Sequence, residues 1–186
     1  MLAYVFWHWP QSGVTPETYI AHLESFHRTL AANKPPGFQR SAVFRIEDAG
    51  WLPTRGPVYE DWYVVNDSAA LDPLNDGAIS GACELPHKLV AREAAGGTAG
   101  LYRLRFGEEV LRESRFAVWL AKPDDVSYRD FYDALAPVTA QANVALWGRQ
   151  MTLGPTTEFC LHSRTPVQLP AGYTGRQVPL LPLIGT

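Results

Sequence analysis

The chain has 186 residues, of which 46% are hydrophobic and 19% charged, and its formal net charge is -3 at pH 7. This composition is typical of a globular protein with a buried core, and the weakly acidic balance excludes the basic surface that nucleic acid or an anionic membrane requires. The two cysteines, Cys83 and Cys160, form no CxxC pattern, which argues against a disulfide framework or a thiolate metal site. Because the N-terminus lacks a positively charged leader and no apolar run reaches the roughly 18 residues of a membrane span, we expect a cytoplasmic protein without a metal ion.

The first half of the sequence predicts one α+β unit. Residues 2–9 are β-branched and aromatic and end at Pro10, as a strand would. Thr15 is the expected cap of a helix that runs at helical spacing to the Pro-Pro-Gly stop at 35–37. The next elements are strands at 38–47 and 58–66, a helical stretch at 68–95 that prolines and glycines break in two, and a strand at 101–107. This order is that of a ferredoxin-like unit.

The second half repeats the opening of the first. Residues 115–123 predict a strand and 128–142 a helix, and adding 112 carries Thr15, Tyr19 and Leu23 onto Ser127, Phe131 and Leu135. Two more strands are expected within 143–154 and 156–163. We expect the copy to end without its second helix and last strand, because 164–186 contain four Pro and three Gly with no helical period. We therefore divide the chain into a ferredoxin-like half at 1–110, a shortened second half at 111–163 and an extended arm at 164–186.

The helix from Thr15 to His27, TPETYIAHLESFH, carries an aromatic residue four positions after its cap, an aliphatic residue four later and a histidine four after that. With Gly37 and the strand that follows, this pattern resembles the first helix of the dimeric α+β barrel superfamily, particularly its EthD-like members. The resemblance implies tandem ferredoxin-like repeats whose two antiparallel sheets pack their open faces together with the helices outside. It also implies a barrel interior that holds a small molecule, often aromatic or polyketide-like.

His27 is the first candidate for catalysis. It lies on the apolar face of its helix with Leu23 and Leu30, and the equivalent residue of the second copy is Thr139. A polar residue at both positions favours a polar pocket, because an unpaired buried polar group costs about 1 to 3 kcal/mol. There the imidazole could act as a general base. The alternative is a core histidine that Glu24 or a backbone carbonyl satisfies.

Strand alternation groups the remaining catalytic candidates. His8 shares a face with Tyr4 and Phe6, and Asp61 shares a face with Tyr63. If these faces open into the barrel, Asp61 could orient a histidine and Tyr63 could donate a hydrogen bond to a carbonyl oxygen. If they do not, the ligand would meet the tryptophans of the opposite faces, which are Trp7 and Trp62.

The fourth strand suggests an anion-binding group. Its apolar face should pack under helices, which would leave Arg103 and Arg105 on the barrel side to bind a carboxylate or phenolate. Arg149, beside Trp147 in the second copy, could stack on an aromatic ligand. Solvated or ion-paired arginines are the alternative interpretation of these residues.

His87 is the one histidine whose surroundings permit a cofactor. Cys83 and Glu84 lie four and three residues before it, near the same helical face, so a metal ion or a haem iron is permitted but not required. No GxGxxG, P-loop or GxSxG motif is present, so nucleotide and serine hydrolase chemistry have no support. We expect no cofactor.

The function that these residues indicate is that of a small-molecule enzyme acting without a nucleotide cofactor. The resemblance implies an aromatic or polyketide-like compound as substrate and isomerisation, cyclisation or oxygenation as the reaction. One alternative is a non-catalytic protein for ligand binding or assembly, and a second is a haem-binding protein. We also expect a homodimer, because the shortened second copy leaves a sheet edge open unless the C-terminal arm covers it.

Overall fold

The computed structural model describes residues 1–47, 49–54, 56–151 and 156–185. Their secondary structure is mixed α+β, as predicted, with nine strands and four α-helices. In the first half these are β1 (Leu2–Pro10), α1 (Pro16–Asn33), β2 (Phe38–Ile46), β3 (Val58–Val65), α2 (Leu71–Ile79), α3 (Glu84–Glu93) and β4 (Ala94–Gly107). In the second half they are β5 (Phe116–Leu120), α4 (Tyr128–Thr139), β6 (Val144–Arg149), β7 (Phe159–Ser163), β8 (Gly175–Pro179) and β9 (Leu181–Gly185).

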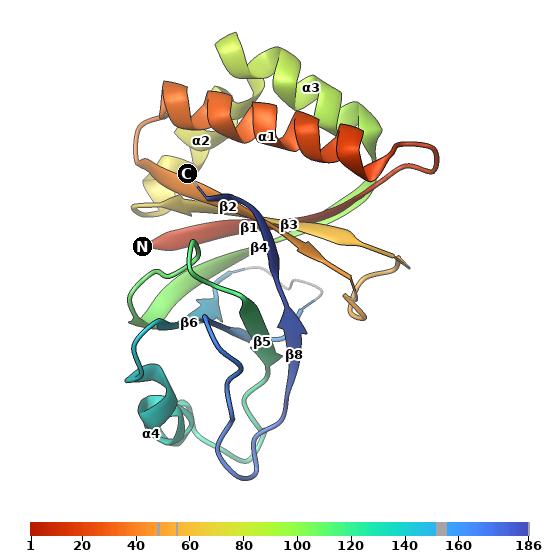
Figure 1. Ribbon diagram of the computed structural model, residues 1–186. Helices are drawn as coiled ribbons and strands as arrows, with labels where there is room; N and C mark the ends of the chain where they lie inside the picture. Colours follow the sequence, from red (N-terminus) through yellow and green to blue (C-terminus); the bar gives the residue numbers. More distant parts are fainter. Residues whose placement is uncertain (48, 55, 152–155, 186) are drawn as a thin grey trace.

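All nine strands belong to one antiparallel sheet, in the order β8-β5-β7-β6-β4-β1-β3-β2-β9. The two halves join where β4 pairs with β6. At the ends of this order stand β8 and β9, which are separated only by Leu180. One continuous C-terminal segment therefore pairs first with β5 and then with β2, and it nearly closes the sheet into a barrel (Figure 1).

The expectation that the second half lacks its last strand is wrong. β8 pairs with β5 along the whole strand, from Phe116 to Leu120. Each half therefore has the same internal strand order, β4-β1-β3-β2 and β8-β5-β7-β6. The prolines and glycines of the arm made these strands hard to predict. Such residues are tolerated in edge strands, where a missing backbone N–H does not break the sheet hydrogen bonding. The arm also covers the sheet edge, since β9 pairs with β2.

The first helix of each half begins in the same way. The Thr15 side chain accepts a hydrogen bond from the Thr18 N–H, and the Ser127 side chain accepts one from the Asp130 N–H. Tyr19 and Leu23 are fully buried behind the first cap. Helix α1 ends at Lys34, whose left-handed backbone precedes the predicted proline stop.

The space inside the barrel is a packed core. Trp7, Trp62, Trp119 and Trp147 are almost completely buried there in one cluster. The ring of Trp62 lies 5.2 Å from that of Trp147 and 6.3 Å from that of Trp119, centroid to centroid. The ligand-holding hollow expected between the sheets is therefore filled by indoles among the described residues.

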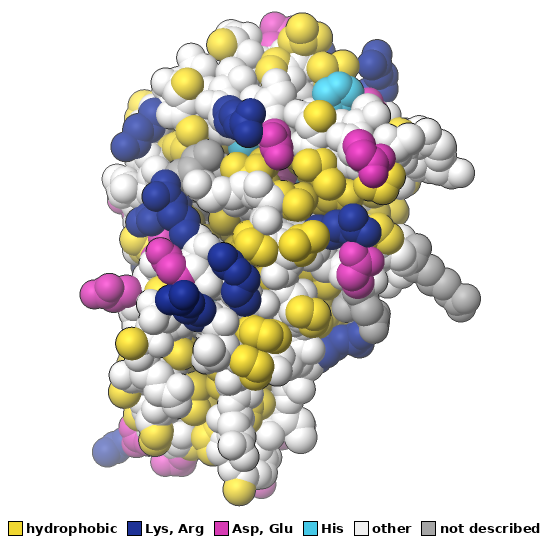
Figure 2. Space-filling model, in the orientation of Figure 1, with side chains coloured by type: hydrophobic (Ala, Val, Ile, Leu, Met, Phe, Trp, Pro, Cys, Tyr) yellow, Lys and Arg dark blue, Asp and Glu magenta, His cyan; other side chains and the backbone are white. Residues whose placement is uncertain are grey.

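Helices cover the outer faces of the sheet. α1, α2 and α3 lie over the strands of the first half, and α4 lies over the second half (Figure 1). Over the described ranges, none of the helices combines the length and the apolar character that crossing a membrane requires. Lys and Arg side chains share one face of the molecule with acidic and hydrophobic ones (Figure 2).

Candidate functional site

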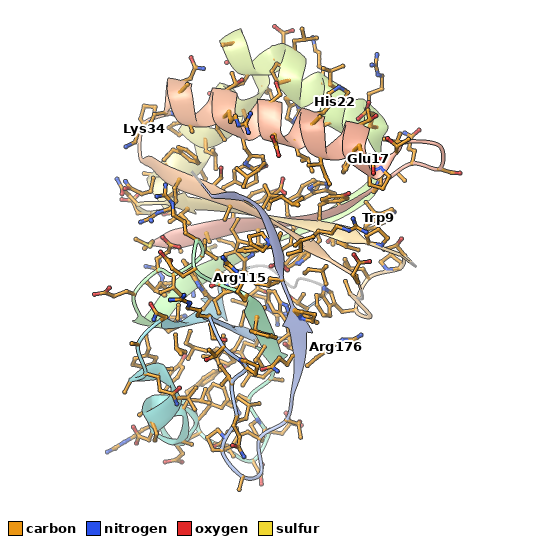
Figure 3. The ribbon with its side chains drawn as sticks, viewed as in Figure 1. Trp9, Glu17, His22, Lys34, Arg115 and Arg176 are labelled. Atoms are coloured by element: carbon orange, nitrogen blue, oxygen red, sulfur yellow. The ribbon has the colours of Figure 1, made fainter. Side chains whose placement is uncertain are left out.

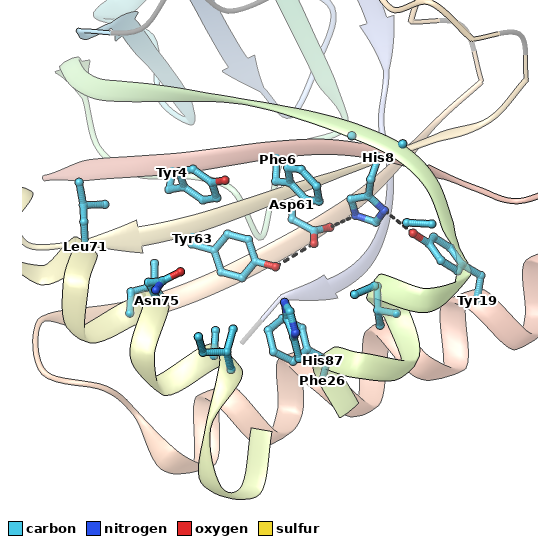
Figure 4. A pocket seen from close by; sticks show the side chains of 18 of the residues that line it. Tyr4, Phe6, His8, Tyr19, Phe26, Asp61, Tyr63, Leu71, Asn75 and His87 are labelled. Atoms are coloured by element: carbon cyan, nitrogen blue, oxygen red, sulfur yellow. Dashed lines mark hydrogen bonds and ion pairs between the residues drawn. The ribbon is translucent and has the colours of Figure 1, made fainter. Parts of the chain in front are cut away.

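A cavity of about 690 Å³ lies on the outer face of the first half, between the sheet and the helices. Its floor is formed by β1 and β3, and its walls by α1, α2, α3 and the start of β4. This volume is within the range of small-molecule sites. The site is thus on the side of the sheet opposite to the expected barrel interior (Figure 4).

The cavity exists because α2 and α3 are held away from the sheet. Helix α3 has no buried residue, and α2 has only Leu74. At the start of β4, Gly97 allows the Phe6 ring to lie directly against the backbone, because a Cβ atom there would collide with that ring. Phe6 in turn stacks on His8, with ring centroids 5.1 Å apart. The floor is therefore lined by flat rings.

The polar floor comes from alternate residues of two paired strands. Tyr4 pairs with Tyr63 and Phe6 pairs with Asp61, so all four side chains point to the helical side. His8 follows on the same face of β1, opposite Tyr59. The predicted grouping of His8 with Tyr4 and of Asp61 with Tyr63 is confirmed by this register.

Asp61 is the centre of this polar group. Its Oδ1 lies 3.1 Å from Nε2 of His8, and its Oδ2 lies 3.2 Å from Nε2 of His27. The Tyr63 hydroxyl donates to Oδ2 at 2.9 Å. One carboxylate therefore faces three donors, from β1, α1 and its own strand.

Each imidazole has one hydroxyl on the side away from Asp61. Nδ1 of His8 lies 2.7 Å from the Tyr19 hydroxyl, and Nδ1 of His27 lies 2.8 Å from Oγ of Ser41. With an ionised Asp61, we assign the Nε2 proton to both rings, so that the two hydroxyls donate to Nδ1. Nε2 of His8 and Oδ1 of Asp61 face each other as an ion pair without a well-aligned hydrogen bond, and the other polar atoms of the cluster then have hydrogen-bond partners.

Electrostatics keep Asp61 ionised. Burial alone would raise its pKa, but the imidazoles of His8 and His27 outweigh that effect and hold the pKa well below its usual range. Burial, reinforced by the Asp61 charge, raises the pKa of the Tyr63 phenol well above its ordinary value. Tyr63 therefore stays a hydrogen-bond donor across the physiological pH range.

His27 is beneath the floor of the cavity rather than in it. Its exposed fraction is 0%, whereas Tyr63 is 8% exposed and lines the cavity. The His27 nitrogens contact the side chains of Ser41 and Asp61. Glu24, one of the alternative partners, pairs with Arg28 on the helix surface. The structure instead places His27 behind Asp61, outside the cavity lining, where it can position the carboxylate.

His87 lines the cavity wall from α3 and lies edge-on to Phe26, with ring centroids 5.5 Å apart. Partial burial lowers its pKa. Its expected companions are elsewhere, because Glu84 pairs with Lys88 and Cys83 is buried in the core of the first half. Within the described ranges, no three His, Cys, Asp or Glu side chains are grouped closely enough to hold a metal ion.

The predicted tryptophans do not reach this cavity. Trp7 and Trp62 point into the barrel, where their Nε1 atoms donate to the buried Glu60 at 2.5 and 2.6 Å. Trp147 lies in the same interior cluster. These residues form the core, and none of them lines the site.

The predicted arginines also lie away from the cavity. Tyr102 points into the barrel, so the neighbouring Arg103 and Arg105 point outwards, the reverse of the expected arrangement. Arg103 donates to Gln150 at 3.0 Å, and Arg149 donates to the carbonyl of Thr156 at 2.9 Å. The face of β4 was misassigned because Tyr102 and Leu104 are equally suited to a barrel interior and to a helix interface.

Sequence reasoning missed Tyr19, Ser41 and Asn75. The sequence did carry a signal for Tyr19, because it lies on the same helical face as His27, eight residues earlier. Asn75 lines the cavity from α2. No sequence pattern pointed to Asn75 or Ser41. The position of Asn75 at the cavity depends on the placement of α2, and that of Ser41 depends on the β2–β3 register.

The second half contains the same face built from apolar residues. Leu120 pairs with Phe159 there as His8 pairs with Tyr59, and Val118 pairs with Leu161 as Phe6 pairs with Asp61. These residues pack with α4 and with three side chains of the C-terminal segment, namely Val167, Leu169 and Tyr173. The strand order alone therefore does not require a polar cluster at this place.

Comparisons with known proteins identify the fold. No protein-family model and no curated protein matches this sequence. A solved structure of a candidate monooxygenase from Lactobacillus acidophilus NCFM matches 99% of this chain and 95% of its own, with a TM-score of 0.63 and 10% identity. An anthrone oxidase-like protein matches 97% of this chain and 91% of its own, with a TM-score of 0.51 and 11% identity. Both matches extend over nearly the whole chain and support a barrel-like α+β fold, whereas the EthD-like and tandem-repeat features that the resemblance implies stay predictions.

Proposed function

We propose that this protein is a small-molecule enzyme that binds a flat aromatic compound in the outer cavity of its first half and removes a proton from it without a nucleotide cofactor. Oxygenation of the resulting anion is the reaction that we favour over isomerisation or cyclisation. The monooxygenase-like and anthrone oxidase-like structural neighbours support this choice, although they share only the fold.

The observation that carries the proposal is an ionised carboxylate at the wall of a cavity, held between two imidazoles. Asp61 and His8 are only 2% and 1% exposed, yet both line the cavity. Buried ionic groups are costly, and replacing them with apolar residues is often neutral or stabilising. The equivalent face of the second half uses leucine and phenylalanine. A polar cluster that the fold does not need, placed at a cavity, supports a catalytic role.

The geometry suggests a role for each member. Tyr63, the most exposed of the cluster, would donate its hydroxyl proton to a carbonyl or developing enolate oxygen of the ligand. The Asp61 carboxylate would accept the proton from carbon, and His8 would hold that carboxylate through Nε2, because Nδ1 of His8 accepts from the Tyr19 hydroxyl. His27 and Tyr19 are positioning residues that fix the carboxylate and the His8 ring.

Anthrone is the probe that tests this proposal. Loss of a proton from its methylene carbon gives a carbanion, which passes electrons to dioxygen and forms a carbon–oxygen bond. Loss of water from the resulting hydroperoxide gives anthraquinone, so one anthrone and one dioxygen yield one anthraquinone and one water. We expect enzyme-dependent formation of anthraquinone and, without oxygen, exchange of the methylene hydrogens with deuterated water.

Asp61→Asn should lower both rates by about 10² to 10⁴, the usual contribution of acid–base catalysis. The matched control is His22→Ala, because His22 lies on α1, where its Nδ1 contacts Glu93 at 2.8 Å (Figure 3). Equal rates in the wild type and Asp61→Asn would contradict the proposal. Binding of anthrone with neither exchange nor turnover would favour the non-catalytic ligand-binding alternative.

A further inference from the structure

We infer that the ligand of this cavity is uncharged and that Asn75 on α2 binds a polar group at the end of the ligand away from Asp61. This inference rests on the proposed function, because it concerns the same cavity. It specifies which aromatic compounds the site accepts.

The charges of the cavity wall select against anions. Asp61 and Asp72 both line the cavity, and both are carboxylates. An anionic ligand would leave water for a wall that, among the described residues, carries two carboxylates and no Lys or Arg, and burying an unpaired charge is costly. The arginine of β4 nearest in sequence to this wall, Arg103, holds Gln150 on the outer surface instead. A neutral hydroxyl or carbonyl meets no such penalty.

Asn75 offers a neutral partner across the cavity from the sheet. Its side chain projects from α2 towards the floor that carries Tyr63 (Figure 4). The side chain is exposed to solvent, and in the part of the chain that the structure describes no hydrogen bond occupies its amide, which can both donate and accept. Asp61 and Tyr63 engage one end of a ligand, so Asn75 is placed to engage a hydroxyl or carbonyl on another edge.

The floor gives this ligand its shape. Phe6 and His8 form a stacked pair with ring planes 23° apart, and Tyr4 forms a tilted pair with Tyr63. Tyr4, which is 37% exposed and lines the cavity, offers a surface on which a flat polycyclic ring can lie while its polar edges face Asp61 and Asn75. The cavity thus fits neutral aromatic ketones and phenols in preference to aromatic acids.

The test compares binding of anthrone and anthrone-2-carboxylate by calorimetry at pH 8, without oxygen. Wild-type protein should bind anthrone at least about tenfold more tightly, since 1.4 kcal/mol is a factor of ten. Asn75→Lys should raise the affinity for the carboxylate about tenfold relative to the affinity of the same variant for anthrone. Asn33→Lys is the matched control, because it makes the same change on the exposed face of α1, where Asn33 bonds only the Thr29 carbonyl.

Three outcomes would overturn the inference, and they are distinguishable. If the wild type binds both compounds equally, the selection for neutral ligands is wrong while the proposed function stands. If it binds neither, the proposed function fails as well. If Asn33→Lys helps the carboxylate as much as Asn75→Lys does, net charge explains the effect and the placement of Asn75 against the ligand is wrong.

Discussion

Two consecutive residues of β3 carry buried carboxylates to opposite faces of the sheet. Asp61 faces the cavity between two imidazoles, and Glu60 faces the barrel between two indole N–H groups. Burial raises the pKa of Glu60 to about 7, although the hydrogen bonds from Trp62 and Trp7 oppose the shift. The pKa of Asp61 is shifted in the other direction. The partner, rather than the depth of burial, decides whether each acid is charged.

The two acids should therefore change stability with pH in opposite senses. The folded protein keeps the Glu60 proton up to about pH 7, whereas the unfolded chain releases it near pH 4.3, so this residue lowers stability as pH rises between those values. The free energy of unfolding of the wild type should fall by roughly 3 kcal/mol from pH 5 to pH 8 because of Glu60, and Glu60→Gln should abolish that fall. Urea unfolding of both proteins at the two pH values measures this, and parallel pH profiles would contradict it. Asp61 should instead stabilise the fold above about pH 4, with that contribution lost as pH falls further.

At the scale of elements, the sequence predicted the type of most segments but not the side of the sheet on which function lies. Thr15, Pro16 and the 35–37 stop were enough to define α1, and alternation grouped His8 with Tyr4. Which face turns outward depends on how the sheet closes, and that depends on pairing between distant strands. The sequence identified His27 as a polar residue on an apolar helix face, yet its contact with Asp61 depends on how α1 packs over β3.

The apolar face of the second half predicts how the polar face of the first can be replaced. We expect the combined change His8→Leu, Tyr19→Phe, His27→Leu and Asp61→Leu to abolish turnover and to keep or raise the free energy of unfolding, by up to about 4 kcal/mol. Asp61→Ala alone should lower it by about 3 to 5 kcal/mol, because it leaves the imidazoles without their carboxylate. Urea unfolding decides between these results. A combined variant less stable than Asp61→Ala would show that the fold needs the cluster.

At the scale of the whole molecule, the C-terminal segment joins the two halves. β8 extends one end of the sheet and β9 the other, and Leu180 and Ile184 are buried beneath them. The predicted domain division at residue 163 separates β8 from the strands that it completes, so a boundary there remains only a proposal. Edge strands containing Pro179 and Pro182 lack a clear alternating pattern, which explains why the sequence indicated an arm without strands.

Removing residues 180–186 should expose the edge of β2 and convert a defined species into a self-associating one, because unpaired edges template further pairing. Light scattering after size exclusion measures this change. The control is Leu181→Lys in the full chain, since Leu181 is 54% exposed and its replacement keeps β9. The same measurement on the full chain tests the predicted homodimer. An unchanged mass after truncation would mean that β9 does not protect the edge.

The pairing of Ala42 with Gly185 also has a consequence for biosynthesis. The strands and helices that surround the cavity leave the ribosome before β6 and long before β9, so both sheet edges of this half are unpaired at first, and the edge of β2 stays unpaired longest. Contacts so far apart in the chain form slowly. A chaperone that shields β2 during this interval would raise the yield of active protein, and a translational pause downstream of β4 would lower it.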